Sequence, residues 1–169
     1  GNVPSRNIGA TYRIPLENEW YKAAFYKGGS VTAGYWLFAT QSDAAPSAVM
    51  ATATGDGTLD GTTPVASGNS ANWRRTADWN GLDGNVTTVG TNGGPSAYGA
   101  FDMSGNVWEW NAFNDVPWYG RGMRAGAFYD YDWPYLSAVQ GLGYDAGALE
   151  SGIGFRLAGA LETPVPEID

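Results

Sequence analysis

One carboxylate in this chain lies between two tryptophans, in the stretch SGNVWEW. If the stretch is extended, successive side chains alternate between two faces, so Trp108 and Trp110 share one face and Glu109 points to the other. A carboxylate next to such bulky apolar side chains needs a partner that stabilises its charge. The residues alone leave three kinds of partner open for Glu109: water, an arginine or a metal ion.

A second stretch, from Tyr129 to Gly152, begins by alternating aromatic and acidic side chains. In an extended chain the first aromatic rings would share one face and the first carboxylates the other. Exposed tyrosine and tryptophan are good contact residues because they are large and rigid. They could stack on sugar rings, pack against another copy of the protein, or fold inward and cover the core. The candidate ligand-binding residues are Tyr129, Asp130, Tyr131, Asp132, Trp133, Tyr135 and Tyr144.

Composition narrows the chemistry further. The 169 residues include no cysteine and no histidine. This excludes thiolate and imidazole nucleophiles, Ser–His triads, and the zinc, haem, copper and iron–sulfur sites that depend on those ligands. With 9 basic and 17 acidic residues the net charge is -8, which argues against nucleic acid and leaves cation binding possible. No apolar run approaches 18 residues, so no transmembrane helix is expected.

One amphipathic helix is predicted, in the stretch PLENEWYKAAFYK. Glutamates lie in its first turn and lysines in its last turn, which matches the helix dipole. Trp20, Ala23 and Ala24 form a stripe that would face a core. Gly28 and Gly29 are expected to end the helix.

The rest of the chain predicts a loop-rich domain. Residues 30–99 are dominated by Gly, Ser, Thr, Asn, Asp and Ala, which favours long irregular loops with scattered aromatic anchors. Short strands are expected in YGAFDM, NVWEW, GMRAGAFY and IGFRLAG. We expect a single domain over 1–160 and a C-terminal tail over 161–169.

Four stretches together resemble a known family. YRIPLENEWYKAA, YGAFDMSGNVWEW, RGMRAGAF and IGFRLA, read in this order from Tyr12 to Ala158, are similar to the landmarks of the formylglycine-generating enzyme (sulfatase-modifying factor) domain family. The resemblance implies an α+β, loop-rich variant of the C-type lectin fold with little regular secondary structure. Oxidases of the family use a cysteine pair near GFR to bind copper, and related sulfoxide synthases bind iron through histidines. Since both residue types are missing, we expect no enzymatic activity.

The resemblance also implies one or two calcium ions. In the family, the loop corresponding to DMSGNVWE binds calcium through a side-chain oxygen, two backbone carbonyls and a glutamate. Its counterparts here are Asp102, Gly105, Val107 and Glu109. A second family site is matched more loosely by Asn72, Trp73, Asp83 and Asn85, where Trp73 and Asn85 would contribute backbone oxygens. Calcium takes six to eight oxygen ligands, so the missing cysteine and histidine are no obstacle.

Several landmark residues have structural alternatives. Glu109 could instead pair with an arginine such as Arg124 or Arg156, or cap backbone N–H groups. Arg13 and Arg156 are expected in partly buried ion pairs with Glu17 or Glu19, because the planar guanidinium suits carboxylates. The aromatic residues expected in the core are Trp20, Trp108, Trp110 and Phe155. Leu16 stands where the family usually has a threonine that caps the helix, so that cap must be replaced or lost.

These patterns together predict a non-catalytic, calcium-stabilised binding or assembly module outside the cell, or on the cell surface, of a bacterium. Its partner would be a protein or glycan ligand, and the alternative is a structural protein that self-associates through the same aromatic surface. In relatives diversified by retroelements, the segment that corresponds to Tyr129–Gly152 carries ligand-binding residues. Here the arginine and proline expected near Gly141 and Ala146 are missing. The first residue is Gly1, which would suit processing of a precursor, although an arbitrary boundary would look the same.

Overall fold

The computed structural model describes residues 10–30, 32–112 and 120–159. Within these ranges the regular elements are α1 (Glu17–Phe25), a short 3-10 helix η1 (Trp133–Leu136) and strands of two to four residues. The strands are β1 (Tyr12–Arg13), β2 (Ser47–Ala48), β3 (Met50–Ala51), β4 (Gly57–Thr58), β5 (Ser70–Ala71), β6 (Trp108–Trp110), β7 (Arg121–Arg124), β8 (Leu142–Tyr144), β9 (Ile153–Gly154) and β10 (Ala158–Gly159). The expected loop-rich α+β architecture is confirmed.

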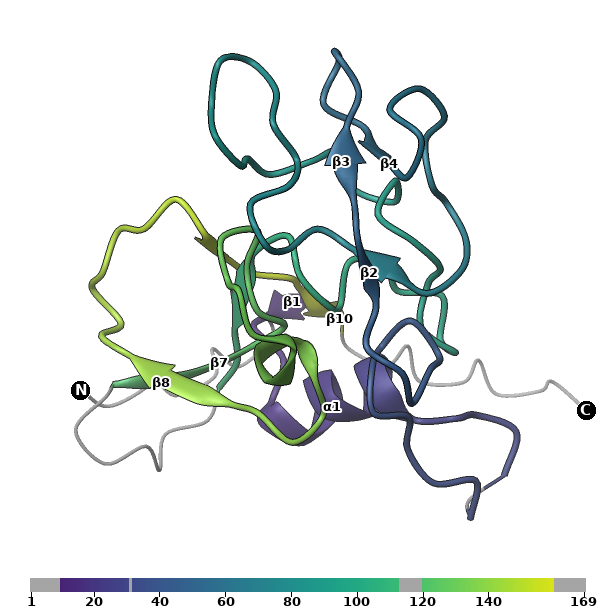
Figure 1. Cartoon of the computed structure of the whole chain (residues 1–169). Coiled ribbons are helices and arrows are strands. Elements are labelled where there is room, and N and C mark those ends of the chain that lie inside the picture. The colour runs from purple at the N-terminus through teal and green to yellow at the C-terminus, as the bar shows by residue number, and fades with distance from the viewer. Residues whose placement is uncertain (1–9, 31, 113–119, 160–169) are drawn as a thin grey trace, which may run out of the picture.

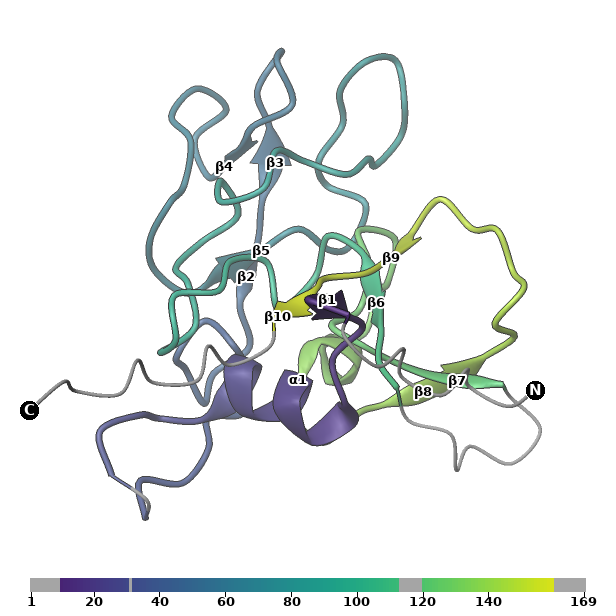
Figure 2. The same cartoon turned by 180° about the vertical axis from the view of Figure 1, so that it is seen from behind.

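The main sheet has four strands in the order β8-β7-β6-β9. β6 runs antiparallel to β7 and parallel to β9, and β7 runs antiparallel to β8. The pairs β1–β10, β2–β5 and β3–β4 form two-stranded ladders. Figures 1 and 2 show the long loops that carry β3 and β4 above α1, with the antiparallel strands β7 and β8 beside the helix.

α1 buries two of the three side chains of its predicted apolar stripe, Trp20 and Ala24, while Ala23 is half-buried. Trp20, Ala24 and Phe25 are buried and pack in one core cluster with Met103. The threonine cap is replaced in part, because the carboxylate of Glu19 accepts a hydrogen bond from the Leu16 backbone N–H at 2.8 Å.

The helix ends earlier than predicted. Its last residue is Phe25, and Tyr26 is already extended, so the expectation that Gly28 and Gly29 end the helix was wrong. After the helix the chain turns back, and the Trp36 N–H donates a hydrogen bond to the Phe25 carbonyl at 2.7 Å. The Phe25 carbonyl therefore pairs with Trp36 instead of with an N–H group of a further helical turn.

Two further expectations about local structure were wrong. YGAFDM is a turn rather than a strand, because Asp102 has a φ of 54° and its carboxylate bonds to the neighbouring 90–92 loop. Phe155 was expected in the core but is 62% exposed. Its neighbour Arg156 points inward to Glu109, and adjacent side chains of extended chain point to opposite sides. Trp20 and Trp108 are buried as expected, and Trp110 is half-buried.

Three arginine–glutamate ion pairs join separate segments of the described chain. Arg13 pairs with Glu19, as expected, and Arg124 pairs with Glu17. Arg156 pairs with Glu109 rather than with a glutamate of α1. None of the described helices is long and apolar enough to cross a membrane. The predicted tail over 161–169 lies outside the described residues.

Candidate functional site

Glu109 lies in the centre of β6 and is 5% exposed. Arg156 donates to it through Nε at 2.5 Å and through Nη2 at 2.6 Å, so the contact is bidentate. Trp20 Nε1–H donates to the same carboxylate at 2.7 Å. Of the partners that the sequence left open for Glu109, the structure therefore contains an arginine, assisted by an indole N–H.

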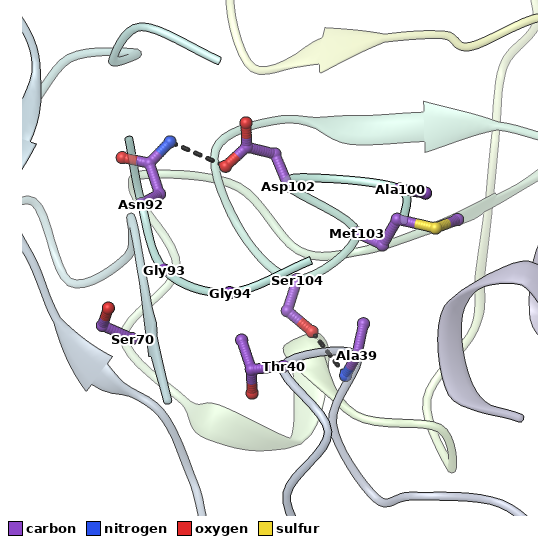
Figure 3. Close-up of a pocket in the computed structure, with 10 residues that line it drawn as sticks. All are labelled: Ala39, Thr40, Ser70, Asn92, Gly93, Gly94, Ala100, Asp102, Met103 and Ser104. Carbon is purple, nitrogen blue, oxygen red and sulfur yellow. Dashed lines mark hydrogen bonds between the residues drawn. The ribbon is translucent and has the colours of Figure 1, made fainter. Parts of the chain in front are cut away.

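Two other residues of the first predicted calcium set, Asp102 and Gly105, are also engaged by protein groups. The Asp102 carboxylate accepts hydrogen bonds from Gly90 N–H and from Asn92 Nδ2, both at 2.8 Å (Figure 3). The Gly105 carbonyl accepts from Val107 N–H at 2.9 Å. Among the described residues there is no group of three or more acidic side chains suited to a metal. These contacts do not favour calcium between Asp102 and Glu109, and calcium there stays a prediction.

A small cavity of about 10 Å³ lies beside Asp102 (Figure 3). It has room for one water-sized molecule. Ser70 Oγ lines this cavity, is buried, and has no hydrogen-bond partner among the described residues. The cavity therefore suits a structural water and is too small for a ligand.

The structure brings some residues of the second predicted calcium set close together. Asn72 is fully buried, and its Nδ2 lies 2.8 Å from the carbonyl oxygen of Asn85. Its Oδ1 is buried without a hydrogen-bond partner among the described residues. Asp83 is exposed, and the Trp73 carbonyl accepts from the Thr76 hydroxyl at 3.1 Å. An orphaned buried oxygen fits a cation better than the satisfied carboxylate of Glu109 does.

Two oxygen atoms at this place were missed from the sequence. Thr87 Oγ1 and Asn106 Oδ1 lie 3.1 and 3.0 Å from Asn72 Nδ2, so three oxygens including the Asn85 carbonyl surround one amide nitrogen. An NH₂ group has two hydrogens and cannot serve three acceptors fully. Asn106 lies within the SGNVWEW motif itself, so that position could have been considered as a ligand.

The segment that begins at Tyr129 does not form the predicted two-faced strand. Tyr129 is half-buried, and Asp130 is drawn inward because its carboxylate accepts from Ala127 N–H at 2.7 Å. Burial raises the pKa of Asp130. The 3-10 helix that starts at Trp133 then breaks the alternation, and Tyr135 packs edge-on against Trp108. The prediction of two alternating faces was therefore wrong.

The predicted ligand-binding residues separate into three groups. Asp130 and Tyr135 have structural contacts. Tyr131 and Trp133 are 62% and 45% exposed, and Asp132 between them is exposed too. Tyr129 and Tyr144 line one hollow of about 420 Å³, which we call the Tyr129 hollow. Its apolar lining comes from the main sheet and consists of Trp108, Met123, Leu142 and Ile153.

The polar lining of the Tyr129 hollow comes from outside the sheet centre. It consists of Arg75, Tyr129, Tyr144, Glu150 and Ser151. Four of these five residues belong to the predicted segment from Tyr129 to Gly152, and the part of it between β8 and β9 arches outward from the body (Figures 1 and 2). Arg75 was missed because it lies more than fifty positions before that segment in the chain.

Negative charge dominates the electrostatics around the two tyrosines. Burial raises the pKa of the Tyr129 hydroxyl, and the carboxylates of Asp130 and Glu150 raise it further. The charge of Glu150 raises the pKa of Tyr144, whose hydroxyl donates to that carboxylate at 3.3 Å. Both hydroxyls therefore stay protonated at neutral pH, and that of Tyr129 can donate a hydrogen bond to a ligand.

The comparisons with known proteins agree with this architecture. The family model described as Sulfatase-modifying factor enzyme 1-like domain matches residues 2–161. Among solved structures, one titled "Crystal Structure of CarF" is 23% identical, with a TM-score of 0.51, over 93% of this chain and 51% of that chain. Treponema denticola variable protein 1 is 20% identical, with a TM-score of 0.49, over 86% of this chain and 46% of that chain. The chain thus spans about half the length of these structures. No match was found among curated proteins.

Proposed function

The chain belongs to the sulfatase-modifying factor enzyme 1-like family, and from this premise we propose that it is a non-catalytic, calcium-stabilised binding module that works outside the cell. The absence of cysteine and histidine from all 169 residues supports the non-catalytic part of the proposal. The chemistry of the family's oxidases and sulfoxide synthases rests on those side chains.

The observation that carries the binding role is the Tyr129 hollow. It combines an apolar lining from the sheet with the hydroxyls of Tyr129 and Tyr144, and pockets of this composition are typical of ligand sites. Its volume of about 420 Å³ suits a small molecule or one or two units of a larger ligand. The ligand would enter beside the arch between β8 and β9.

Replacing Tyr144 with alanine is expected to weaken ligand binding at least tenfold, because the variant loses both a ring and a hydroxyl of the hollow. The probe is a panel of free monosaccharides, disaccharides and amino acids, titrated while tryptophan fluorescence is recorded. Tyr12→Ala is the matched control, since Tyr12 is 66% exposed on β1 and does not line the hollow. Equal binding by both variants would place the ligand elsewhere, and no binding by any member of the panel would count against a small-molecule site.

Calcium is proposed at the Asn72 set, because the Asn72 amide has an unpartnered buried oxygen and the Asn85 carbonyl lies 2.8 Å from the nitrogen of the same amide. These residues would hold the ion through oxygen atoms, and Asp83 would contribute the carboxylate. A bound calcium ion would supply a fixed positive charge that fastens the 72–85 loops together. Oxygen-only sites of modest affinity are filled where calcium is plentiful, which supports an extracellular location.

Adding 10 mM calcium to chelator-treated protein is expected to raise the melting temperature by about 3 to 10 °C, from the affinities of extracellular calcium modules and mass action. Asp83→Asn should remove at least half of this rise, whereas Asp43→Asn, which changes another exposed carboxylate, should retain it. Thermal melting with circular dichroism measures all three proteins. An unchanged melting temperature of the wild type would remove calcium from the proposal.

Self-association is the second candidate function. It is favoured by the exposure of Tyr131 and Trp133, which do not line the Tyr129 hollow. Light scattering and electron microscopy of the wild type and of a Tyr131→Ala/Trp133→Ala variant separate the two roles. A monomeric wild type would exclude assembly as the primary function.

A further inference from the structure

We infer that Arg75 selects the ligand of the Tyr129 hollow, and that this ligand carries a carboxylate next to an apolar side chain, as an apolar α-amino acid or the C-terminus of a peptide does. The inference rests on the binding role proposed above and names the chemical class that the hollow accepts.

Arg75 differs from most of the arginines around the sheet; among the described residues Arg121 of β7 likewise has no ion pair or ring contact, but it does not line the hollow. Arg13, Arg124 and Arg156 are each in an ion pair with a glutamate. Arg74 lies with its guanidinium 4.6 Å from the centre of the Trp73 ring. Within the described part of the chain, the Arg75 guanidinium has neither an ion pair nor a ring contact, although the whole protein carries a net charge of -8. A cation without an acidic partner in an acidic protein is available to an anionic ligand.

The backbone of Arg75 is held firmly in an unusual conformation. Arg74 and Arg75 have φ values of 67° and 56°, in the left-handed region that side chains other than glycine rarely adopt. Their N–H groups donate to the carbonyls of Asp130 and Phe128 at 2.9 and 2.8 Å. On the other side, a Cβ added to Gly84 would lie 2.8 Å from the Arg75 Cβ. Strained residues held in this way on both sides are typical of functional sites.

The rest of the hollow matches the remainder of such a ligand. Met123, Leu142 and Ile153 provide an aliphatic lining for an apolar side chain. Glu150 lies in the same lining and presents a carboxylate to a free ammonium group. A cation and an anion beside apolar side chains favour a zwitterion with an apolar side chain over a neutral sugar, which has neither charge. A free amino acid would use both charges, and a peptide C-terminus would use Arg75 alone.

The test is a calorimetric titration of the full chain with four probes: leucine, leucine amide, N-acetyl-leucine and glucose. Leucine is expected to bind, and leucine amide, which lacks the carboxylate, at least tenfold more weakly. Arg75→Gln should weaken leucine binding at least tenfold and leave leucine amide unchanged. Arg74→Gln is the matched control. Arg74 is next to Arg75 in the chain and has the same backbone conformation, but its side chain does not line the hollow. This variant should change leucine binding less than twofold.

The outcomes separate this inference from the proposed function. Equal binding of N-acetyl-leucine and leucine identifies a peptide C-terminus as the source, and a loss of N-acetyl-leucine binding identifies the free amino acid. If glucose alone binds and Tyr144→Ala abolishes that binding, the hollow is a ligand site but the carboxylate preference is wrong. If leucine binds with equal affinity to wild type and Arg75→Gln, the role of Arg75 is wrong. If neither leucine nor N-acetyl-leucine binds at 10 mM, the inferred ligand class is wrong, whether or not leucine amide or glucose binds.

Discussion

Replacing Glu109 with glutamine is expected to lower the free energy of unfolding by about 2 to 4 kcal/mol, because the change leaves the Arg156 guanidinium partly buried without its counter-charge. The Glu109 side chain is 7% exposed and that of Arg156 is 26% exposed, so solvent screens the pair in part. For a chain of this length the melting temperature should fall by about 5 to 15 °C. Denaturant titration followed by tryptophan fluorescence measures the loss, and a loss below about 1 kcal/mol would contradict it.

A surface ion pair provides the control for Glu109. Lys27 and Asp43 lie 3.7 Å apart with side chains 31% and 61% exposed, so Asp43→Asn should cost less than about 0.5 kcal/mol. Arg156→Met and the double variant complete a thermodynamic cycle, whose coupling energy should fall between about 0.5 and 3 kcal/mol. The same variants also test whether calcium binds to Glu109. If the ion bound to Glu109 in solution, a chelator would destabilise the wild type and leave Glu109→Gln unaffected.

The sequence predicted well those features that depend on neighbouring residues. α1 follows from the local spacing of Trp20 and Ala24 and from glutamates near its start, so its existence and buried face were correct. Its end was wrong because the competing partner of Phe25, Trp36, lies in a loop whose path no local pattern specifies. The main-sheet strands at β6, β7 and β9 were found because bulky and β-branched side chains there stand between glycines.

The candidate site was predicted less completely because its contacts join distant parts of the chain. Glu109 and Arg156 are 47 residues apart, and the sequence could offer Arg156 only as one of several partners. Because the Arg156 side chain points inward, the side chain of its neighbour Phe155 points outward. The undetermined partner of Arg156 therefore also led to the wrong prediction that Phe155 lies in the core. Arg75 is held at the Tyr129 hollow by its own backbone bond to Phe128 and by that of Arg74 to Asp130, and nothing in its surroundings in the sequence indicates these contacts.

The loop that carries SGNVWEW depends on a glycine for its path. Gly105 has a φ of 83°, and a Cβ at this position would lie 2.4 Å from the backbone oxygen of Asn72. The same oxygen accepts a hydrogen bond from Asn106 N–H at 2.8 Å, while Gly105 N–H donates to the Ala125 carbonyl at 2.6 Å. The backbone is therefore fixed on both sides and cannot move away from an added methyl group.

Gly105→Ala is accordingly expected to lower the free energy of unfolding by more than about 3 kcal/mol, since left-handed strain and a backbone clash act together. Gly61→Ala is the matched control, because Gly61 has nearly the same φ, 84°, with no atom within 4 Å of the added Cβ. That variant should lose about 1 to 2 kcal/mol from the left-handed strain alone. Denaturant titration of both proteins isolates the clash as their difference. Equal losses would show that the 105–106 loop can move away from Asn72, and the buried oxygens around Asn72 would then not be held in a fixed arrangement for a cation.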